Sequence, residues 1–215
     1  HWWPAEKGKP AHRWSFFDVN ADAWKYDKAT DSYYLHYFSQ KQPDLNWENP
    51  KVREEVFSMM RFWFDKGVDG FRMDVINFIS KSEGLPDAPA IPGQRFVSAM
   101  DKFVDGPHVH DYLAEMTREV FDGRDGEFIT IGEMPGVTTE QARLYTDPAR
   151  HELNMVFQFE HVSVDQGPAG KFDYLGLDLV VLKKSLDRWQ AALAEIGWNS
   201  LYWNNHDQPR VVSRY

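Results

Sequence analysis

The sequence has no cysteine, which excludes disulfide bonds and thiolate metal sites. It also has no apolar run near the roughly 18 residues of a membrane span, and it does not open on a signal peptide. We therefore expect a protein of a reducing compartment, placed in the cytoplasm and not associated with a membrane.

Positive charge is scarce. Lys and Arg number 24 against 33 Asp and Glu, which gives a net charge of −9. Nucleic acids and anionic membrane surfaces attract clustered positive charge, and this sequence has no run of Lys or Arg longer than two. We therefore expect no nucleic-acid partner. An apolar content of 42% over 215 residues is enough for a sizeable folded core.

Three separate segments each place a carboxylate at the end of an apolar run. They are residues 67–74 (GVDGFRMD), 128–133 (FITIGE) and 201–207 (LYWNNHD). A single acid after a strand is usually a loop residue or a helix cap, because loops are polar by default. Three such acids, each at the end of a different strand, instead indicate an active site at one end of a sheet.

The first two acids have different surroundings in the sequence. Side chains two apart on a strand share a face, so Arg72 can lie beside Asp74 and stabilise its ionised form. Glu133 has no basic residue within several positions, which favours a carboxyl that keeps its proton near neutral pH. Cleavage of a glycosidic bond needs one carboxyl of each kind.

Helical and strand patterns alternate through most of the chain, which predicts an α/β fold. Residues 1–46 form a loop-rich subdomain with one plausible strand at 32–38, and residues 75–110 form an extended loop. The expected helices are 50–67, 111–121, about 139–145 and 178–196, and the expected strands are 68–73, 128–132, 154–159 and 199–204.

Four such strand–helix units are half of a (β/α)8 barrel, whose active sites lie at the carboxyl ends of the strands. We therefore predict two parts: residues 1–46 as part of an inserted subdomain, and residues 47–215 as a partial (β/α)8 TIM barrel of about strands 4 to 7. An open half-barrel would expose sheet edges and a core face. The remainder of the barrel is accordingly an expected partner, and activity of these residues alone is not expected.

Four motifs in this order resemble the α-amylase superfamily, and most closely its oligo-1,6-glucosidase, dextran glucosidase and isomaltase branch. The resemblance covers nearly the whole chain. The motifs are residues 42–46 (QPDLN), 70–77 (GFRMDVIN), 131–134 (IGEM) and 204–210 (NNHDQPR). The strand-three motif of the family would lie before His1, and the family's early strands, eighth strand and C-terminal β domain have no counterpart in this sequence.

The resemblance implies a role for most of the polar residues in these motifs. Asp74 corresponds to the nucleophile with Arg72 in support, and Glu133 corresponds to the acid/base. His206 and Asp207 correspond to residues that grip the sugar hydroxyls. Arg210, in the same motif, either reaches toward the site or pairs with a neighbouring acid.

The resemblance also implies an activity. It is retaining hydrolysis of α-1,6 and also α-1,4 glucosidic bonds, at the non-reducing end of short, isomaltose-like oligosaccharides, without cofactor or metal. A β-branched residue after the nucleophile, here Val75, accompanies a preference for α-1,6 bonds in this family, although Val75 can also be read as a strand-end packing residue. Retention predicts carboxyls about 5 to 5.5 Å apart, against roughly 6.5 to 9.5 Å for inversion.

Three other functions compete with this interpretation. A sucrose isomerase or transglucosylase of the same fold would share the chemistry and differ in the acceptor. A non-catalytic transporter-partner homologue is disfavoured because the three acids are present. Metal-dependent chemistry is disfavoured because His206 and Asp207 are fewer than the three or four ligands that a metal site needs. Among the loop histidines, which are usually structural, His161 is the candidate substrate contact.

Overall fold

A computed structural model describes residues 1–16, 18–168 and 170–215. The chain divides into two compact units, residues 1–56 with 78–109 and residues 57–77 with 110–215. The long loop, residues 75–110, thus falls mostly in the same unit as the N-terminal segment. The predicted domain boundary between residues 46 and 47 stays a prediction. Within the described part of the chain, no helix combines the length and the apolar character needed to cross a membrane.

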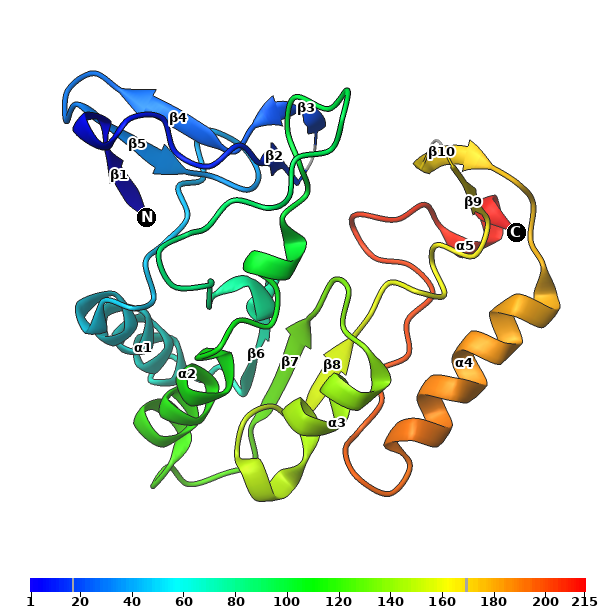
Figure 1. Ribbon diagram of the computed structural model, residues 1–215. Helices are drawn as coiled ribbons and strands as arrows, with labels where there is room; N and C mark the ends of the chain where they lie inside the picture. Colours follow the sequence, from blue (N-terminus) through cyan, green and yellow to red (C-terminus); the bar gives the residue numbers. More distant parts are fainter. Residues whose placement is uncertain (17, 169) are drawn as a thin grey trace. The chain divides into compact units, whose positions relative to one another are not determined.

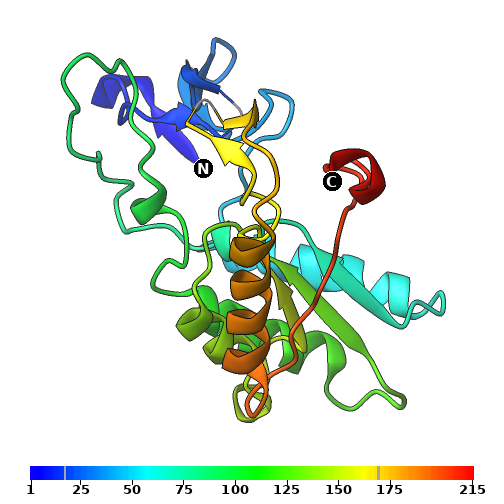
Figure 2. The same ribbon diagram turned by 90° about the vertical axis from the view of Figure 1, so that its right-hand side faces the viewer.

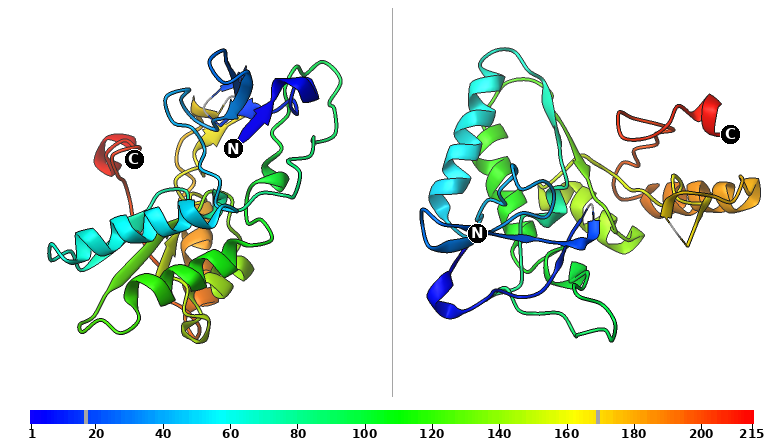
Figure 3. Two further views of the ribbon diagram at one scale, coloured as in Figure 1. Left: turned by 90° about the vertical axis from the view of Figure 1, so that its left-hand side faces the viewer. Right: turned by 90° about the horizontal axis from the view of Figure 1, so that it is seen from above.

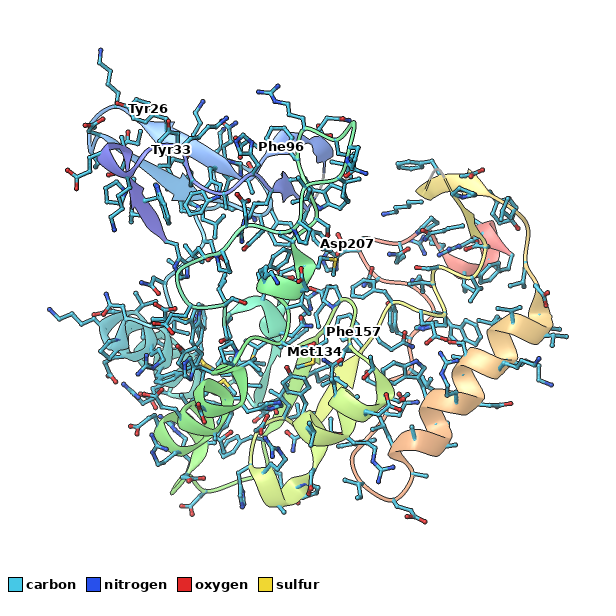
Figure 4. All side chains as sticks on the ribbon, in the orientation of Figure 1. Tyr26, Tyr33, Phe96, Met134, Phe157 and Asp207 are labelled. Atoms are coloured by element: carbon cyan, nitrogen blue, oxygen red, sulfur yellow. The ribbon has the colours of Figure 1, made fainter. Side chains whose placement is uncertain are left out.

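Short antiparallel strands build the first unit. Strand order is β1-β5-β4 in one sheet, and β2 pairs with β3 in another. Their bounds are β1 Trp2–Pro4, β2 Trp14–Ser15, β3 Asp18–Asp22, β4 Trp24–Asp27 and β5 Ser32–Leu35. The Asp27 carboxylate accepts hydrogen bonds from Thr30 and so closes the turn between β4 and β5. Tyr26 and Tyr33 face each other across that hairpin, with ring centroids 5.3 Å apart (Figure 4).

Aromatic rings form the core of the first unit. The Tyr37 and Phe103 rings stack with centroids 4.0 Å apart, and Phe78 meets the edge of Phe103 at 5.1 Å. The fully buried Arg13 donates hydrogen bonds from Nη2 to the carbonyls of Leu85 and Pro86, which anchors the long loop.

Helix α1, Pro50–Phe64, begins where the sequence predicts, since the Asn49 side chain accepts a hydrogen bond from the backbone of Lys51 and proline occupies the first helical position. It ends three residues before Gly67, whose φ of +91° suits glycine. Phe64, at the end of α1, packs against Phe128 with ring centroids 4.9 Å apart.

A parallel three-stranded sheet is the centre of the second unit. Its order is β6-β7-β8, with bounds Gly70–Met73, Ile129–Glu133 and Met155–Phe157, and the strands lie side by side in Figure 1. Met73 pairs with Gly132, so the next residue on each strand is an acid, Asp74 or Glu133. The register alone therefore brings the two carboxyls to one edge.

Helices α2, α3 and α4 follow the predicted order. A capping box at Thr138, in which the side chains of Thr138 and Gln141 bond each other's backbone N–H groups, starts α3, and Asp178 caps α4. The helices have the bounds α2 Val109–Met116 with a π-helical turn at Thr117–Phe121, α3 Thr139–Thr146, α4 Leu179–Leu193 and α5 Val211–Arg214. Two further strands are β9 Gln166–Gly167 and β10 Gly170–Tyr174. Single turns of 3₁₀ helix lie at Ala5–Lys7, Ile76–Phe78, Met100–Lys102 and Pro148–Arg150.

The predicted strand at 199–204 is wrong. Only an isolated parallel bridge joins Asn199 to Val156, and the chain then runs without regular structure to α5 (Figure 2). The antiparallel pair β9 and β10 was not predicted, although Gly167, Pro168 and Gly170 are typical turn residues. Both regions follow β8 and flank α4 (Figure 3).

Replacing Gly70 by alanine is expected to destabilise the second unit by about 1 to 3 kcal/mol. An added Cβ would lie 2.0 Å from the carbonyl oxygen of Ile129, so β6 and β7 would have to separate. Chemical denaturation measures the change, with Ser58→Ala on the exposed face of α1 as the control. Equal unfolding free energies for the two variants would contradict the close strand approach.

Candidate active site

One guanidinium joins the two predicted carboxyls. Arg72 donates from Nη1 to Oδ1 of Asp74, and its Nη2 lies 2.8 Å from Oε1 of Glu133. The guanidinium also lies over the Phe157 ring, 5.6 Å from its centroid. Because Arg72 contacts an acid on each side and a ring on its face, it is held in one geometry at the edge of the sheet.

The backbone after Asp74 grips the second carboxyl. The N–H of Val75 donates to Oε2 of Glu133 over 3.1 Å. Val75 has a φ of +37°, which is an outlier for a β-branched residue and marks local strain. Two residues on, the Asn77 amide donates to the carbonyl of Pro135 over 3.1 Å. The segment after β6 is therefore hydrogen-bonded both to the last residue of β7 and to the loop that follows β7.

The two carboxyls have opposite pKa shifts. Burial raises the pKa of Glu133 to about 7, and the interaction with Asp74 raises it further. The hydrogen bond from the backbone of Val75 and the positive charge of Arg72 oppose this shift. Burial also disfavours the charge of Asp74, but the hydrogen bonds from Arg72 and Glu133 outweigh it and lower the pKa of Asp74. Near neutral pH one acid is ionised and the other holds its proton.

The reason for this separation differs from the one that the sequence suggests. Glu133 does have a basic neighbour, since Arg72 contacts it across the sheet. The side chain of Glu133 is only 6% exposed, however, whereas that of Asp74 is 72% exposed. Unequal access to water, and not the absence of a cation, keeps the proton on Glu133.

A pocket of about 370 Å³ opens beside the pair, and its lining includes Arg72, Phe157, Tyr202 and His206. The charge of His206 contributes to the lowered pKa of Asp74, so this histidine lies near Asp74. Sequence reasoning did not single out Tyr202 or Phe157. Tyr202 lies in the same segment as His206, residues 201–207, and its place in the apolar run of that segment was the signal available.

Asp207 joins this group through His206. Oδ2 of Asp207 lies 3.2 Å from Nε2 of His206, and Lys171 donates to the backbone carbonyl of Asp207 over 2.7 Å. Figure 4 shows Asp207 on the loop that leads to α5, while Phe157 lies at the end of β8. The structure thus brings Arg72, Asp74 and Glu133 into direct contact, whereas Asp207 contacts His206, which lines the same pocket as Arg72.

Arg210 lies apart from this contact network. It is exposed and immediately precedes α5, and its guanidinium has no hydrogen bond or ion pair with any residue that the structure describes. Neither a substrate contact nor a pairing with a neighbouring acid is established for it. Within residues 1–16, 18–168 and 170–215, no cluster of three or more His, Cys, Asp or Glu side chains is arranged to hold a metal ion.

Replacing Arg72 by methionine is expected to raise the pKa of both Asp74 and Glu133. The change removes a hydrogen bond to Asp74 and a positive charge that favours both anions. Carbon NMR titration of the two carboxyls measures the effect, with Arg118→Met on the exposed surface as the control. If the two pKa values stay where they are in the unchanged protein, the guanidinium does not tune the pair.

The family described as the catalytic domain of alpha amylase matches residues 1–215. An oligo-1,6-glucosidase of Halalkalibacterium halodurans is 60% identical over 214 residues, which cover 100% of this chain and 38% of the relative. The chain therefore spans well under half the length of that relative.

Solved structures agree with the family match. The trehalose-6-phosphate hydrolase of Bacillus licheniformis superposes with a TM-score of 0.88 at 43% identity, covering 100% of this chain and 37% of that one. An isomaltulose synthase from Erwinia rhapontici superposes with a TM-score of 0.83 at 35% identity, covering 99% and 37%. These proteins have one fold and different named activities, so linkage and acceptor have to be argued from the site.

Proposed function

Because this chain belongs to the alpha-amylase catalytic-domain family, we propose that it carries the catalytic pair of an α-glucosidase that cleaves α-1,6 bonds, and also α-1,4 bonds, at the non-reducing end of short, isomaltose-like oligosaccharides. One observation carries the proposal. Asp74 and Glu133 share a hydrogen bond and a guanidinium, yet their pKa values are shifted in opposite directions. Glycosidic bond cleavage uses one carboxyl in each state.

The reaction proceeds in two displacements. Asp74 attacks the anomeric carbon while Glu133 protonates the departing oxygen, so the glycosidic bond breaks and a covalent glucosyl–Asp74 ester forms. Glu133, now ionised, takes a proton from water, and the resulting hydroxide displaces Asp74 and releases glucose. Each displacement inverts the anomeric centre, and the product therefore keeps the α configuration.

The closeness of the two carboxyls supports retention. Inverting enzymes hold their carboxyls roughly 6.5 to 9.5 Å apart to leave room for a water molecule. Asp74 and Glu133 instead both contact one guanidinium, through Nη1 and Nη2 of Arg72, which holds the two carboxyls close together. Arg72 keeps Asp74 ionised, and His206 and Asp207 hold hydroxyls of the glucosyl ring as it distorts toward an oxocarbenium-like shape.

The same parallel strands support the wider architecture that we propose. Residues 47–215 then form about strands 4 to 7 of a (β/α)8 barrel, with residues 1–46 in an inserted subdomain. The active form includes the rest of the barrel, because β6, β7 and β8 are only three of the strands that such a barrel needs. The cytoplasmic location stays a prediction.

A sucrose isomerase is the second candidate, favoured by the 35% identity to an isomaltulose synthase. Product analysis of the full-length enzyme on isomaltose, maltose and sucrose separates the two. We expect glucose from isomaltose, released first as the α anomer in proton NMR. Isomeric disaccharides formed from sucrose would instead support the isomerase, and β-glucose as the first product would exclude retention.

A further inference from the structure

The segment at residues 199–208 carries His206 and Asp207 but has little backbone pairing to hold it. Its regular contact with the sheet is the single bridge between Asn199 and Val156. Beyond that bridge the chain has no assigned strand up to α5. Something other than a ladder of backbone hydrogen bonds must fix the position of these two residues beside the pocket.

His161 supplies such a contact. Its Nε2 lies 2.7 Å from the carbonyl oxygen of Tyr202, and its Nδ1 lies 3.0 Å from the amide nitrogen of Gln158. A carbonyl can only accept, so Nε2 carries the proton. The Gln158 amide oxygen already accepts from the backbone of Glu160, which leaves the amide nitrogen to donate to Nδ1. This geometry fits the neutral imidazole with its proton on Nε2.

Tyr202 also donates a hydrogen bond back to the turn after β8. Its hydroxyl donates to the carbonyl of Gln158 over 2.9 Å, and its ring meets the His161 ring edge-on at 4.7 Å and the Phe157 ring at 5.2 Å. Tyr202 also lines the pocket beside Arg72. The turn after β8 and the irregular segment are thus joined by two hydrogen bonds, one in each direction.

Burial excludes a direct role in binding. His161 is 2% exposed and both ring nitrogens are occupied, so the expectation that it contacts substrate is wrong. Burial lowers the pKa of His161, while the Tyr202 carbonyl and the Glu160 charge oppose the shift. The ring therefore stays neutral near pH 7, which the bond accepted at Nδ1 requires.

We propose that His161 is a positioning residue, whose Nε2–H fixes the Tyr202 carbonyl and thereby places His206 and Asp207 at the edge of the catalytic pocket. The kinetic part of this inference rests on the proposed function. The structural part, immobilisation of residues 199–208, does not. The interaction acts through Tyr202, so we expect changes at His161 to affect substrate binding without altering the catalytic acids.

The test uses three variants of the full-length enzyme. Glutamine places an amide nitrogen near the position of Nε2, so His161→Gln keeps the donor to Tyr202. Asparagine is shorter and reaches only the position of Nδ1, so His161→Asn loses that donor, and His161→Leu loses both bonds. Hydrogen exchange of peptides covering residues 199–208 is read beside kcat and KM on isomaltose.

We expect faster exchange in this segment and a roughly 10- to 100-fold lower kcat/KM, mainly through KM, for the leucine and asparagine variants. The glutamine variant should be close to wild type in both. Leu113→Ala, which removes a buried side chain of α2, is the control for general destabilisation, and it should leave kcat/KM unchanged. His151→Gln on the exposed surface controls for the substitution itself.

Wild-type exchange and kinetics in the asparagine variant would overturn the inference, and so would a glutamine variant as impaired as the leucine variant. If the leucine variant does not fold, the asparagine variant gives the same comparison. Exchange is measured without substrate. If the wild-type enzyme cleaves no glucoside, the proposed function fails, and faster exchange in the asparagine variant alone would still support immobilisation of the segment by His161.

Discussion

Replacing Asp74 by alanine is expected to lower kcat for an aryl α-glucoside by roughly 10⁴-fold or more, the order seen when a hydrolase loses its nucleophile. Without the carboxylate no covalent ester can form, and the remaining groups only bind the sugar and stabilise charge. Asp74 suits this role because its pKa is lowered and its side chain is 72% exposed, so the ionised oxygen faces the open side of the pair.

The alanine variant also allows a direct test of the face of attack. Azide can fill the space that the carboxylate leaves, and it should restore turnover of a substrate with a good leaving group. The expected product is β-glucosyl azide, because the anion approaches from the side that Asp74 uses. Asp125→Ala, in an exposed loop, should keep the wild-type rate without azide. Substantial activity of Asp74→Ala without azide would rule out Asp74 as nucleophile.

Glu133→Gln is expected to lower kcat/KM on isomaltose by about 10²- to 10⁴-fold, the usual contribution of a general acid. Glutamine keeps the shape and still accepts a hydrogen bond from Val75, but it has no proton to give to a departing sugar. Formation of the covalent intermediate from a dinitrophenyl glucoside should be nearly unchanged, because that leaving group needs no proton. Glu127→Gln, on the exposed loop before β7, is the matched control.

The pH profile of kcat/KM provides the second measurement for Glu133. The acid must be protonated, so wild-type activity should fall as the pH rises through about 7. On the acid side, activity should be lost only when the pH drops below the lowered pKa of Asp74. With the dinitrophenyl substrate the fall above neutral pH should be absent in Glu133→Gln. A profile of that variant that still declines there would assign the proton to another group.

The sequence predicts the structure best where the signal is local, as at helix caps and at the ends of paired strands. Asn49 and Pro50 predict the start of α1, since a capping side chain bonds its own helix. Thr138 or Thr139 can cap α3 by the same argument, and the structure has Thr138 in that place. Asp74 and Glu133 could be paired in advance because they end neighbouring parallel strands. The family match confirms the α-amylase resemblance, while the roles of the individual residues stay predictions.

Long-range contacts could not be read from the sequence in the same way. Spacing gives no sign that Arg72 meets Glu133 or that Val75 turns its N–H to that carboxyl. The first contact depends on the pairing of β6 with β7, and the second depends on the backbone conformation just after β6. The strand expected at 199–204 has the short apolar run of a strand, but such a run does not specify a partner. The position of a histidine after a strand also does not show whether its ring faces substrate or the protein backbone. His161 bonds the backbone carbonyl of Tyr202.

The left-handed backbone at Val75 couples the environment of Glu133 to the cost of folding. A β-branched residue in that conformation costs of the order of 1 to 3 kcal/mol, which the rest of the fold must offset. The same conformation aims the N–H at Glu133 and sets the side chain next to Asp74. Substitutions at position 75 are therefore expected to alter thermal tolerance and the acid strength of Glu133 together, and to require compensating changes elsewhere.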